Sequence, residues 1–297
     1  MFNLTLSSQQ TNSRQSLAVC LAVFLVGPLA TGAEPKKPDR EKARQELVSK
    51  MAAELVEGYE VTKGKDETKL VLHKDPILRW SNPAAGSVYG DVYIWTADGR
   101  PEVLASVYRW YQPYRDQTVE LHSLSTEQVV LGSKQKNKIW MPSGAGVDFL
   151  TVTDGPEPAQ AATQRLQQMR KLSAEFSMRL IDTREDKQKG IERELRMLSQ
   201  PVFRYKSKNP ELLDGAIFAF VEGTDPEAWL LLEARKIEGK FTWQFAFARM
   251  NNDELHGYQK MAEVWKTAKS NASWLGKDLV YGLFPIREIP WEDVPLE

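Results

Sequence analysis

Residues 212–235 read LLDGAIFAFVEGTDPEAWLLLEAR and predict two β-strands joined by a tight turn. Between 216 and 221 both alternating sets of side chains are apolar, which is typical of a strand that is buried on both faces. The turn follows from Gly223, which permits positive φ, and from Pro226, which fixes φ, while the Asp225 side chain can bond nearby backbone amides.

The same stretch carries five carboxylates: Asp214, Glu222, Asp225, Glu227 and Glu233. So many acids raise the question of an acid–base site, in which two carboxylates lie about 5 to 9.5 Å apart across a substrate. Turn residues that project into water do not meet that requirement. We therefore interpret most of this charge as a solvated turn, and catalysis at the turn is the disfavoured alternative.

A similar pattern occurs 125 residues earlier, without gaps. The matched positions include PILRW (76–80) with PVFRY (201–205), Gly90 with Gly215, Pro101-Glu102 with Pro226-Glu227, and Trp140 with Trp265. Only one of the five acids, Glu227, has an acidic counterpart, Glu102, so we expect Glu227 to stabilise the fold. An internal duplication predicts such a pattern. The alternative is that two β-rich halves match through shared alternation, although alternation does not predict the pair Arg79 and Arg204.

Each half opens with a predicted helix and continues with predicted strands. In the first helix Leu47, Met51 and Leu55 recur every four residues before Gly58 ends it, and the second helix begins after residues 155–158. The apolar period then changes to two, which favours a β-meander in each half.

The predicted fold is α+β with two similar units, 34–155 and 156–280, each one helix packed on a mainly antiparallel β-sheet. Residues 254–267 have helical spacing, but their counterpart at 129–140 predicts two short strands around a turn, which we favour. Prolines in 281–297 predict an extended C-terminal tail on the surface.

The first 33 residues have the three regions of a secretory signal peptide. A polar stretch with Arg14 precedes an apolar run at 17–30, and the small residues at 31–33 suit a signal peptidase. The run is shorter than the ~20 residues that a membrane-spanning helix needs, so a cleaved signal is favoured over a retained anchor. We expect a protein exported to the periplasm or the extracellular space.

Cleavage there removes Cys20, the only cysteine, and leaves a mature chain without a disulfide or a thiolate. The 39 Lys and Arg residues nearly balance the 40 Asp and Glu residues, which disfavours binding to nucleic acid or to an anionic membrane. No later segment has the length and apolarity of a membrane span. The expected state after cleavage is a soluble globular protein held together by apolar burial.

Three histidines occur, His73, His122 and His256, and none stands in a metal-ligand spacing. Dinucleotide and phosphate-binding motifs are also missing, so we expect neither a metal nor a cofactor. His122 is flanked by Glu120 and Ser123, but adjacent residues of a strand point to opposite faces and cannot form a local nucleophile–base pair. A structural histidine is favoured. The alternative is a hydrolase that uses His122 with carboxylates from distant parts of the chain.

The nine tryptophans are the unusual feature of the composition. In the segment YRWY (108–111), alternation places Tyr108 and Trp110 opposite Arg109 and Tyr111. We expect one pair in the core and the other at least partly exposed, where aromatic rings can stack on sugars or peptides. The alternative is that all of these aromatic side chains pack in the core. The candidate binding residues are Arg109, Trp110, Tyr111 and His122.

Four segments resemble a known protein family: the opening stretch, TADGRPEVLASVYRWY (96–111), HSLS (122–125) and IWMPSGAGVDF (139–149). The chain resembles a family of exported proteins of unassigned function from planctomycete-type bacteria, over nearly all of the mature sequence. The resemblance implies export and supplies no catalytic residues. We expect a non-enzymatic cell-envelope module of two like domains with a binding or structural role, whose partner is a protein or a glycan. A secreted hydrolase using His122 is the alternative.

Overall fold

The structure is a computed structural model that describes residues 37–134, 138–183, 190–270 and 279–288. This part of the chain contains two helices and mainly antiparallel sheets, so the α+β class is confirmed. The predicted signal segment, 1–33, lies outside the described residues. Neither described helix combines the length and the apolarity that a membrane crossing requires.

The first half of the chain forms a six-stranded and a three-stranded sheet. Its elements are α1 (Lys37–Glu57), β1 (Tyr59–Lys63), β2 (Thr68–Lys69), β3 (Val71–Leu72), β4 (Leu78–Ser81), β5 (Ser87–Ala97), β6 (Arg100–Gln112), β7 (Asp116–Ser123) and β8 (Val129–Ser133). The larger sheet has the order β18-β7-β6-β5-β3, with β4 paired to β5, and the smaller has the order β2-β1-β8. The strand β18 (Tyr281–Glu288) comes from the C-terminal end of the described chain.

The second half forms one nine-stranded sheet with closely similar pairings. Its elements are β9 (Leu150–Thr151), α2 (Ala162–Ser173), β10 (Phe176–Asp182), β11 (Ile191–Met197), β12 (Phe203–Tyr205), β13 (Leu212–Glu222), β14 (Asp225–Ile237), β15 (Lys240–Arg249), β16 (Glu254–Gln259) and β17 (Ala262–Thr267). The order is β17-β16-β10-β11-β13-β14-β15-β9, with β12 paired to β13. Strand β10 pairs with β16 as β1 pairs with β8. The two strands predicted for 254–267 are confirmed.

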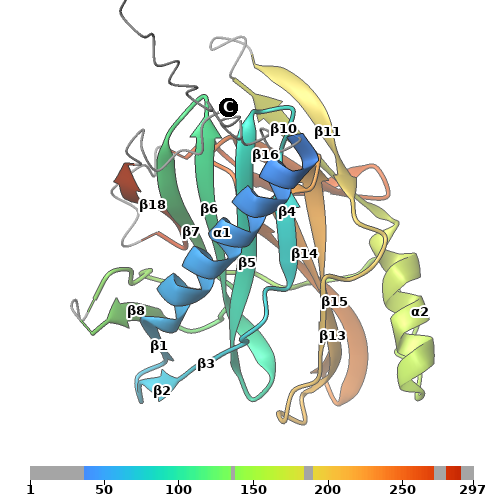
Figure 1. Ribbon diagram of the computed structural model, residues 1–297. Coiled ribbons are helices and arrows are strands. Elements are labelled where there is room, and N and C mark those ends of the chain that lie inside the picture. Colours follow the sequence, from blue (N-terminus) through green and yellow to red (C-terminus); the bar gives the residue numbers. More distant parts are fainter. Residues whose placement is uncertain (1–36, 135–137, 184–189, 271–278, 289–297) are drawn as a thin grey trace, which may run out of the picture.

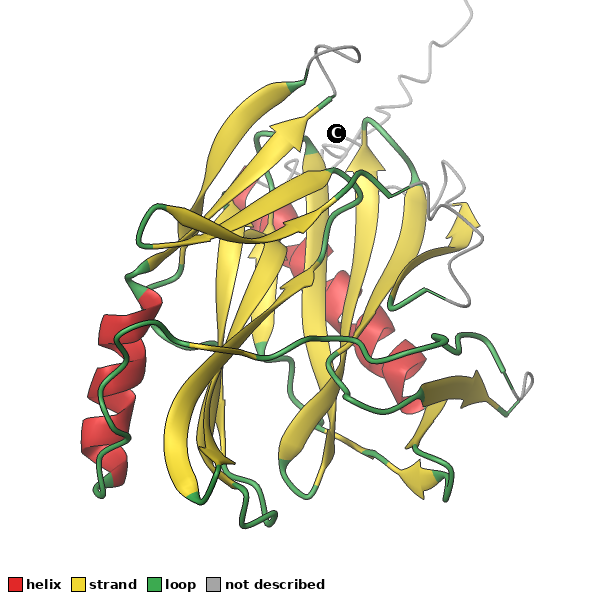
Figure 2. Ribbon diagram, turned by 180° about the vertical axis from the view of Figure 1, so that it is seen from behind, coloured by secondary structure: helices red, strands yellow, loops and turns green. Residues whose placement is uncertain are grey.

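The two large sheets face each other and each carries a helix on its outer side (Figures 1 and 2). Ile217, Ala219 and Val221 of β13 join Trp80, Ile94 and Leu104 of the first half in a core between the sheets. The alternate residues Ala216, Phe218 and Phe220 pack in a second core that includes Met169 and Leu172 of α2. A third core lies under α1 and includes residues of β1 and β8. Strand β13 is thus buried on both faces, as the sequence predicted.

An aromatic ring covers a glycine on the neighbouring strand in each large sheet. Trp80 pairs with Gly90 and Tyr205 pairs with Gly215. A Cβ atom at Gly90 would lie 2.4 Å from the Trp80 ring, and one at Gly215 would lie 2.5 Å from the Tyr205 ring. No side chain fits in that space, so glycine allows each ring to lie flat against its sheet.

Two sequence expectations need correction. In α1 the residues buried most deeply are Val48, Ala52 and Val56, whereas Leu47 is 38% exposed, so the predicted stripe is displaced by one residue. Residues 281–288, expected in a surface tail, form β18 and pair with β7. Pro285 is tolerated because β18 is an edge strand with a register shift at this point, where a missing N–H disturbs no ladder. The remaining residues of the tail, from 289, lie outside the described residues.

Candidate functional site

The turn between β13 and β14 is docked on the first half of the chain. The Ser81 amide donates to Thr224 Oγ1 at 2.9 Å, and the Thr224 hydroxyl donates to the Ser81 carbonyl at 2.8 Å. Asn82 Nδ2 donates to Asp225 Oδ2 at 3.4 Å. Gly223 and Thr224 remain exposed at the tip of the turn, but the interpretation of most of the charge in 212–235 as solvated was wrong.

Three of the five acids of the opening stretch are buried. Asp214 and Glu233 are fully buried and Glu227 is 4% exposed. Asp214 is held by Arg165 of α2 at 2.8 Å and by Arg204 of β12 at 2.7 Å. A buried carboxylate with cationic or hydrogen-bonding partners can be retained in a core, and sequence alternation does not reveal such partners.

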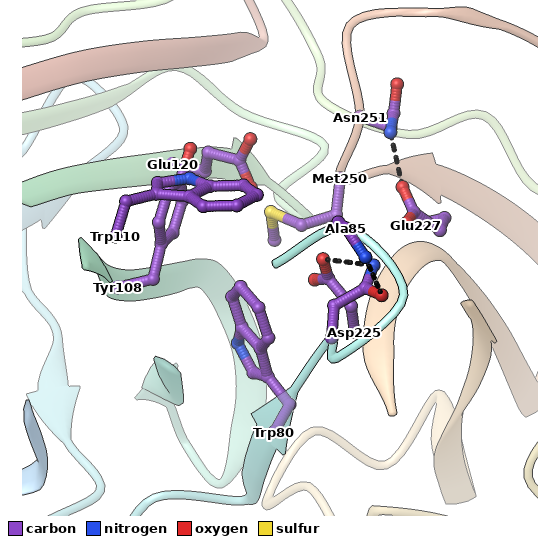
Figure 3. Close-up of a pocket in the computed structure, with 10 residues that line it drawn as sticks. Trp80, Ala85, Tyr108, Trp110, Glu120, Asp225, Glu227, Met250 and Asn251 are labelled. Carbon is purple, nitrogen blue, oxygen red and sulfur yellow. Dashed lines mark hydrogen bonds between the residues drawn. The ribbon is translucent and has the colours of Figure 1, made fainter. Parts of the chain in front are cut away.

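A cavity of ≈ 140 Å³ lies where the docked turn meets the first sheet (Figure 3). It is lined by residues of both halves: Trp80, Asn82, Ala85, Tyr108, Trp110, Glu120, Asp225, Glu227, Met250 and Asn251. Trp110, Tyr108 and Glu120 lie together on one side of it, Asp225, Glu227 and Asn251 lie on the other, and Met250 lies between them (Figure 3).

The aromatic side consists of Trp80, Tyr108 and Trp110. Tyr108 and Trp110 share a face of β6 because they are two residues apart. The rings of Trp80 and Tyr108 lie 5.5 Å apart, and Trp80 Nε1 donates to Ser106 Oγ at 3.1 Å. The ring of Tyr114 meets that of Trp110 edge-on at 5.2 Å. Each Trp is thus oriented by a specific contact.

Glu120 of β7 supplies a second buried carboxyl group to the cavity wall, besides that of Glu227. It is 9% exposed and accepts a hydrogen bond from the Tyr281 hydroxyl at 2.9 Å. The pKa of Glu120 is raised to about 8, chiefly by burial; the hydrogen bond from Tyr281 lowers it, the charge of Glu227 raises it and the charge of Arg249 lowers it. Near neutral pH this group is mainly a neutral carboxylic acid that can donate a hydrogen bond.

Asp225 and Glu227 come from the start of β14 and are held by amide groups. Asn82 donates to Asp225, and Asn251 donates to Glu227. The backbone also fixes this part of the wall, because the Met250 amide donates to the Glu227 carbonyl at 2.8 Å. These bonds orient both carboxylates at the edge of the cavity.

The hairpin turn of the first half docks in a reciprocal way on the second half. The Lys208 amide donates to the Asp98 carbonyl at 2.9 Å. Gly99 lies so close to the Lys206 carbonyl that a Cβ there would be 2.3 Å from its oxygen. Position 206 is 125 residues after Ser81, which receives the other turn.

We call each contact between a hairpin turn and the opposite half of the chain a junction. At this second junction a guanidinium group takes the position that a carboxylate takes at the first. Arg100 is the first residue of β6, as Asp225 is the first of β14. Arg100 lies 2.9 Å from Glu233 and 3.2 Å from Glu102, and its guanidinium is 5.5 Å from the Phe149 ring. The Tyr205 hydroxyl also donates to Glu233, at 2.6 Å. The junction is thus occupied by an internal cation between acids and aromatic rings.

Of the four residues proposed from the sequence, only Trp110 lines the cavity. Arg109 and Tyr111 are buried on the opposite face, under α1, where Arg109 Nη1 contacts Met51 Sδ at 3.2 Å and lies over the Tyr111 ring at 5.0 Å. The predicted split of YRWY between two faces is confirmed, with Trp110 on the half-buried face. Arg109 and Tyr111 belong to the packing beneath the helix.

His122 is buried and does not line the cavity. Its Nδ1 lies 2.7 Å from the Ser123 carbonyl, which can only accept, so Nδ1 carries the proton. Burial, helped by Arg249, lowers the pKa of His122 to about 4. Its ring is 6.3 Å from that of Tyr281, the donor to Glu120. Within the described chain neither a carboxylate nor a hydroxyl group hydrogen-bonds to His122.

Sequence reasoning missed most of the residues that line the cavity. Two signals could have found part of them: the acid pair Glu102 and Glu227, and the aromatic pair Trp80 and Tyr205, recur at the 125-residue spacing. Glu120 was noticed only as a neighbour of His122. No group of three or more His, Cys, Asp or Glu residues in the described ranges is arranged to hold a metal ion.

No protein-family model, no curated protein and no solved structure matches this chain.

Proposed function

We propose that this protein is an exported, non-enzymatic binding module in which two like units enclose a ligand pocket. The observation that carries the proposal is the cavity between the aromatic wall of Trp80, Tyr108 and Trp110 and the docked turn at Asp225. Protein interiors are close-packed, so a contact that serves only to join two sheets would be filled by side chains. A concave space with aromatic faces and a few oriented polar groups is typical of a ligand site.

The two units are proposed to descend from an internal duplication. Four observations support this. They are the 125-residue sequence offset, the recurring strand pairings, the aromatic ring that covers a glycine in each sheet, and the reciprocal docking of the two hairpin turns. Shared alternation explains none of these pairings, because alternation specifies the face of a residue and not its partner strand.

Export is proposed from residues 1–33, and the resemblance to an exported bacterial family is in keeping with it. A protein or glycan of the cell envelope is then the expected partner. Expression of the whole chain in a bacterial host, followed by N-terminal sequencing of the exported product, tests this point. We expect the product to begin just after Ala33, and a product that begins at Met1 in the cytoplasm would overturn it.

Binding is tested on the exported protein by following the indole resonances of its tryptophans in NMR. We expect members of a panel of amines, amino acids, sugars and short peptides to shift the Trp80 and Trp110 indoles, and Trp110→Leu to abolish the effect at unchanged melting temperature. Absence of any such shift at millimolar ligand contradicts the proposal. Turnover of an ester, glycoside or peptide that is lost in Glu120→Gln would replace it with an enzyme.

A further inference from the structure

We infer that the cavity binds an alkylammonium group, and that its natural guest is the side chain of a lysine on a partner protein. The inference rests on the proposed binding function and adds the chemistry of the ligand. It is carried by a comparison of the two junctions between hairpin turn and sheet, together with the size and lining of the cavity.

The junction at Arg100 contains a cation of the kind that we infer the cavity to bind. The guanidinium of Arg100 lies between the carboxylates of Glu102 and Glu233 and near the ring of Phe149. Arg235 lies at the same junction, 3.0 Å from Glu233 and 4.4 Å from the Phe149 ring. Acids and aromatic rings there surround cations that the chain itself supplies.

The cavity has the acids and the aromatic rings, but its counterpart of Arg100 is an acid. At the 125-residue spacing, Trp80 takes the place of Tyr205, Glu227 that of Glu102, and Asp225 that of Arg100. The position that supplies a cation at one junction therefore supplies a carboxylate at the other. A cationic ligand in the cavity would meet carboxyl groups and aromatic rings, as Arg100 does at the other junction.

The described residues that line the cavity favour a cation over an anion. They include the carboxyl groups of Asp225 and Glu227 and that of Glu120, which is mainly neutral near neutral pH and can ionise beside a cation, and no Lys, Arg or His. The nearby guanidinium of Arg249 is engaged by backbone carbonyls, at 2.7 Å from Asn251 O and 2.8 Å from Asp253 O. The faces of Trp and Tyr rings attract ammonium groups, so both walls contribute.

The volume favours an alkyl arm over a sugar ring. A cavity of about 150 Å³ holds one benzene molecule, and a hexose has about twice as many non-hydrogen atoms. The ≈ 140 Å³ available here therefore suits a narrow chain that ends in a charged group. Lysine is the side chain with that shape, and Met250 offers apolar contact to its methylene groups.

The test uses calorimetry and tryptophan fluorescence on the whole exported protein. The probes are N-acetyl-lysine methylamide, its ε-acetylated form, the norleucine analogue, butylamine, glucosamine and N-acetylglucosamine. We expect the lysine amide to bind, and the two neutral analogues to bind at least about tenfold more weakly. Butylamine should bind as an ammonium without the peptide, whereas glucosamine tests an amino sugar as the source of the charge.

Two substitutions in the same turn form a matched pair, because each removes one carboxylate and only one of these carboxylates lines the cavity. Asp225→Asn removes a carboxylate that lines the cavity, and we expect it to weaken lysine-amide binding about tenfold. Glu222→Gln removes a carboxylate that also accepts from Asn82 but lies outside the lining, and binding should be unchanged. Melting temperatures of both variants check that the turn stays docked.

The outcomes separate this inference from the binding function. If N-acetylglucosamine binds and the amines do not, or if glucosamine binds more tightly than the lysine amide, the lysine assignment is overturned while the binding site stands. Equal binding of the lysine amide by Asp225→Asn and the unchanged protein also overturns it. If no probe binds, the lysine assignment is overturned, and the proposed binding function is decided by the wider NMR panel of amines, amino acids, sugars and short peptides.

Discussion

The carboxyl group of Glu120 combines a wall position in the cavity with a strongly raised pKa. Tyr281 and Tyr108 face it as hydrogen-bonding groups, Arg249 as a cation and Glu227 as an anion. Because burial dominates these effects, the group resists ionisation. Because its pKa is raised, the Glu120 carboxyl group can donate a hydrogen bond to a neutral ligand, and it can ionise beside a cationic ligand.

The pH dependence of stability follows from this pKa. The folded protein holds the Glu120 proton up to about pH 8, whereas the unfolded chain releases it near its ordinary value of 4.5. Unfolding therefore becomes more favourable as pH rises through this window, by at most about 1.4 kcal/mol per pH unit. We expect Glu120→Gln to flatten the decline of unfolding free energy between pH 5 and pH 8, measured by urea denaturation. An equal decline in both proteins contradicts the raised pKa.

Glu227 was predicted from the sequence to stabilise the fold, and its burial strengthens that prediction. Glu227→Ala leaves the amide of Asn251 without its carboxylate and opens a space beneath the docked turn. We expect a loss of about 1–3 kcal/mol in unfolding free energy. Thermal and chemical denaturation measure the loss, and a variant as stable as the original protein would count against a structural role.

At the scale of single elements, local patterns predicted strands better than faces of helices. Alternation and turn residues act between near neighbours, so the meanders and the strands at 254–267 were predictable. The buried stripe of α1 was displaced by one residue because Leu47 and Val48 are both apolar, and only the sheet beneath decides which is covered. Likewise, no local rule predicts that β18 pairs with β7, far away in sequence.

The glycines under the aromatic rings provide a test at this scale. Gly90→Ala and Gly215→Ala each place a methyl group against a ring at about the distances that real Cβ atoms avoid, so we expect each to cost about 1–3 kcal/mol of unfolding free energy. Gly144→Ala is the matched control, because nothing lies within 4 Å of its Cβ position. Denaturation curves of the three variants decide the matter; equal stability of all three would contradict the packing.

At the scale of the whole molecule, the two halves share their central core. Residues of β5 and β6 pack against residues of β13 and β14, and each hairpin turn docks on the other half. Each half alone would expose one apolar face of its sheet. The halves therefore depend on each other, although they are successive in sequence.

Mutual dependence predicts a single unfolding transition. We expect calorimetry of the exported protein to give equal calorimetric and van't Hoff enthalpies. Polypeptides 34–155 and 156–297, expressed separately, should lack cooperative unfolding. Two resolved transitions, or an independently folded half, would contradict a shared core.

The sequence by itself determined the α+β class, the two-sided burial of β13, the hairpin turns and the separation of Tyr108 and Trp110 from Arg109 and Tyr111. These features depend on residues that are neighbours in the chain, where period and turn chemistry act directly. Only the tertiary structure decided which face of β6 borders a cavity and that Asp225 and Glu227 face Trp80. The cavity wall joins residues more than 100 positions apart, and their proximity is set by the packing of two sheets, which no local pattern contains.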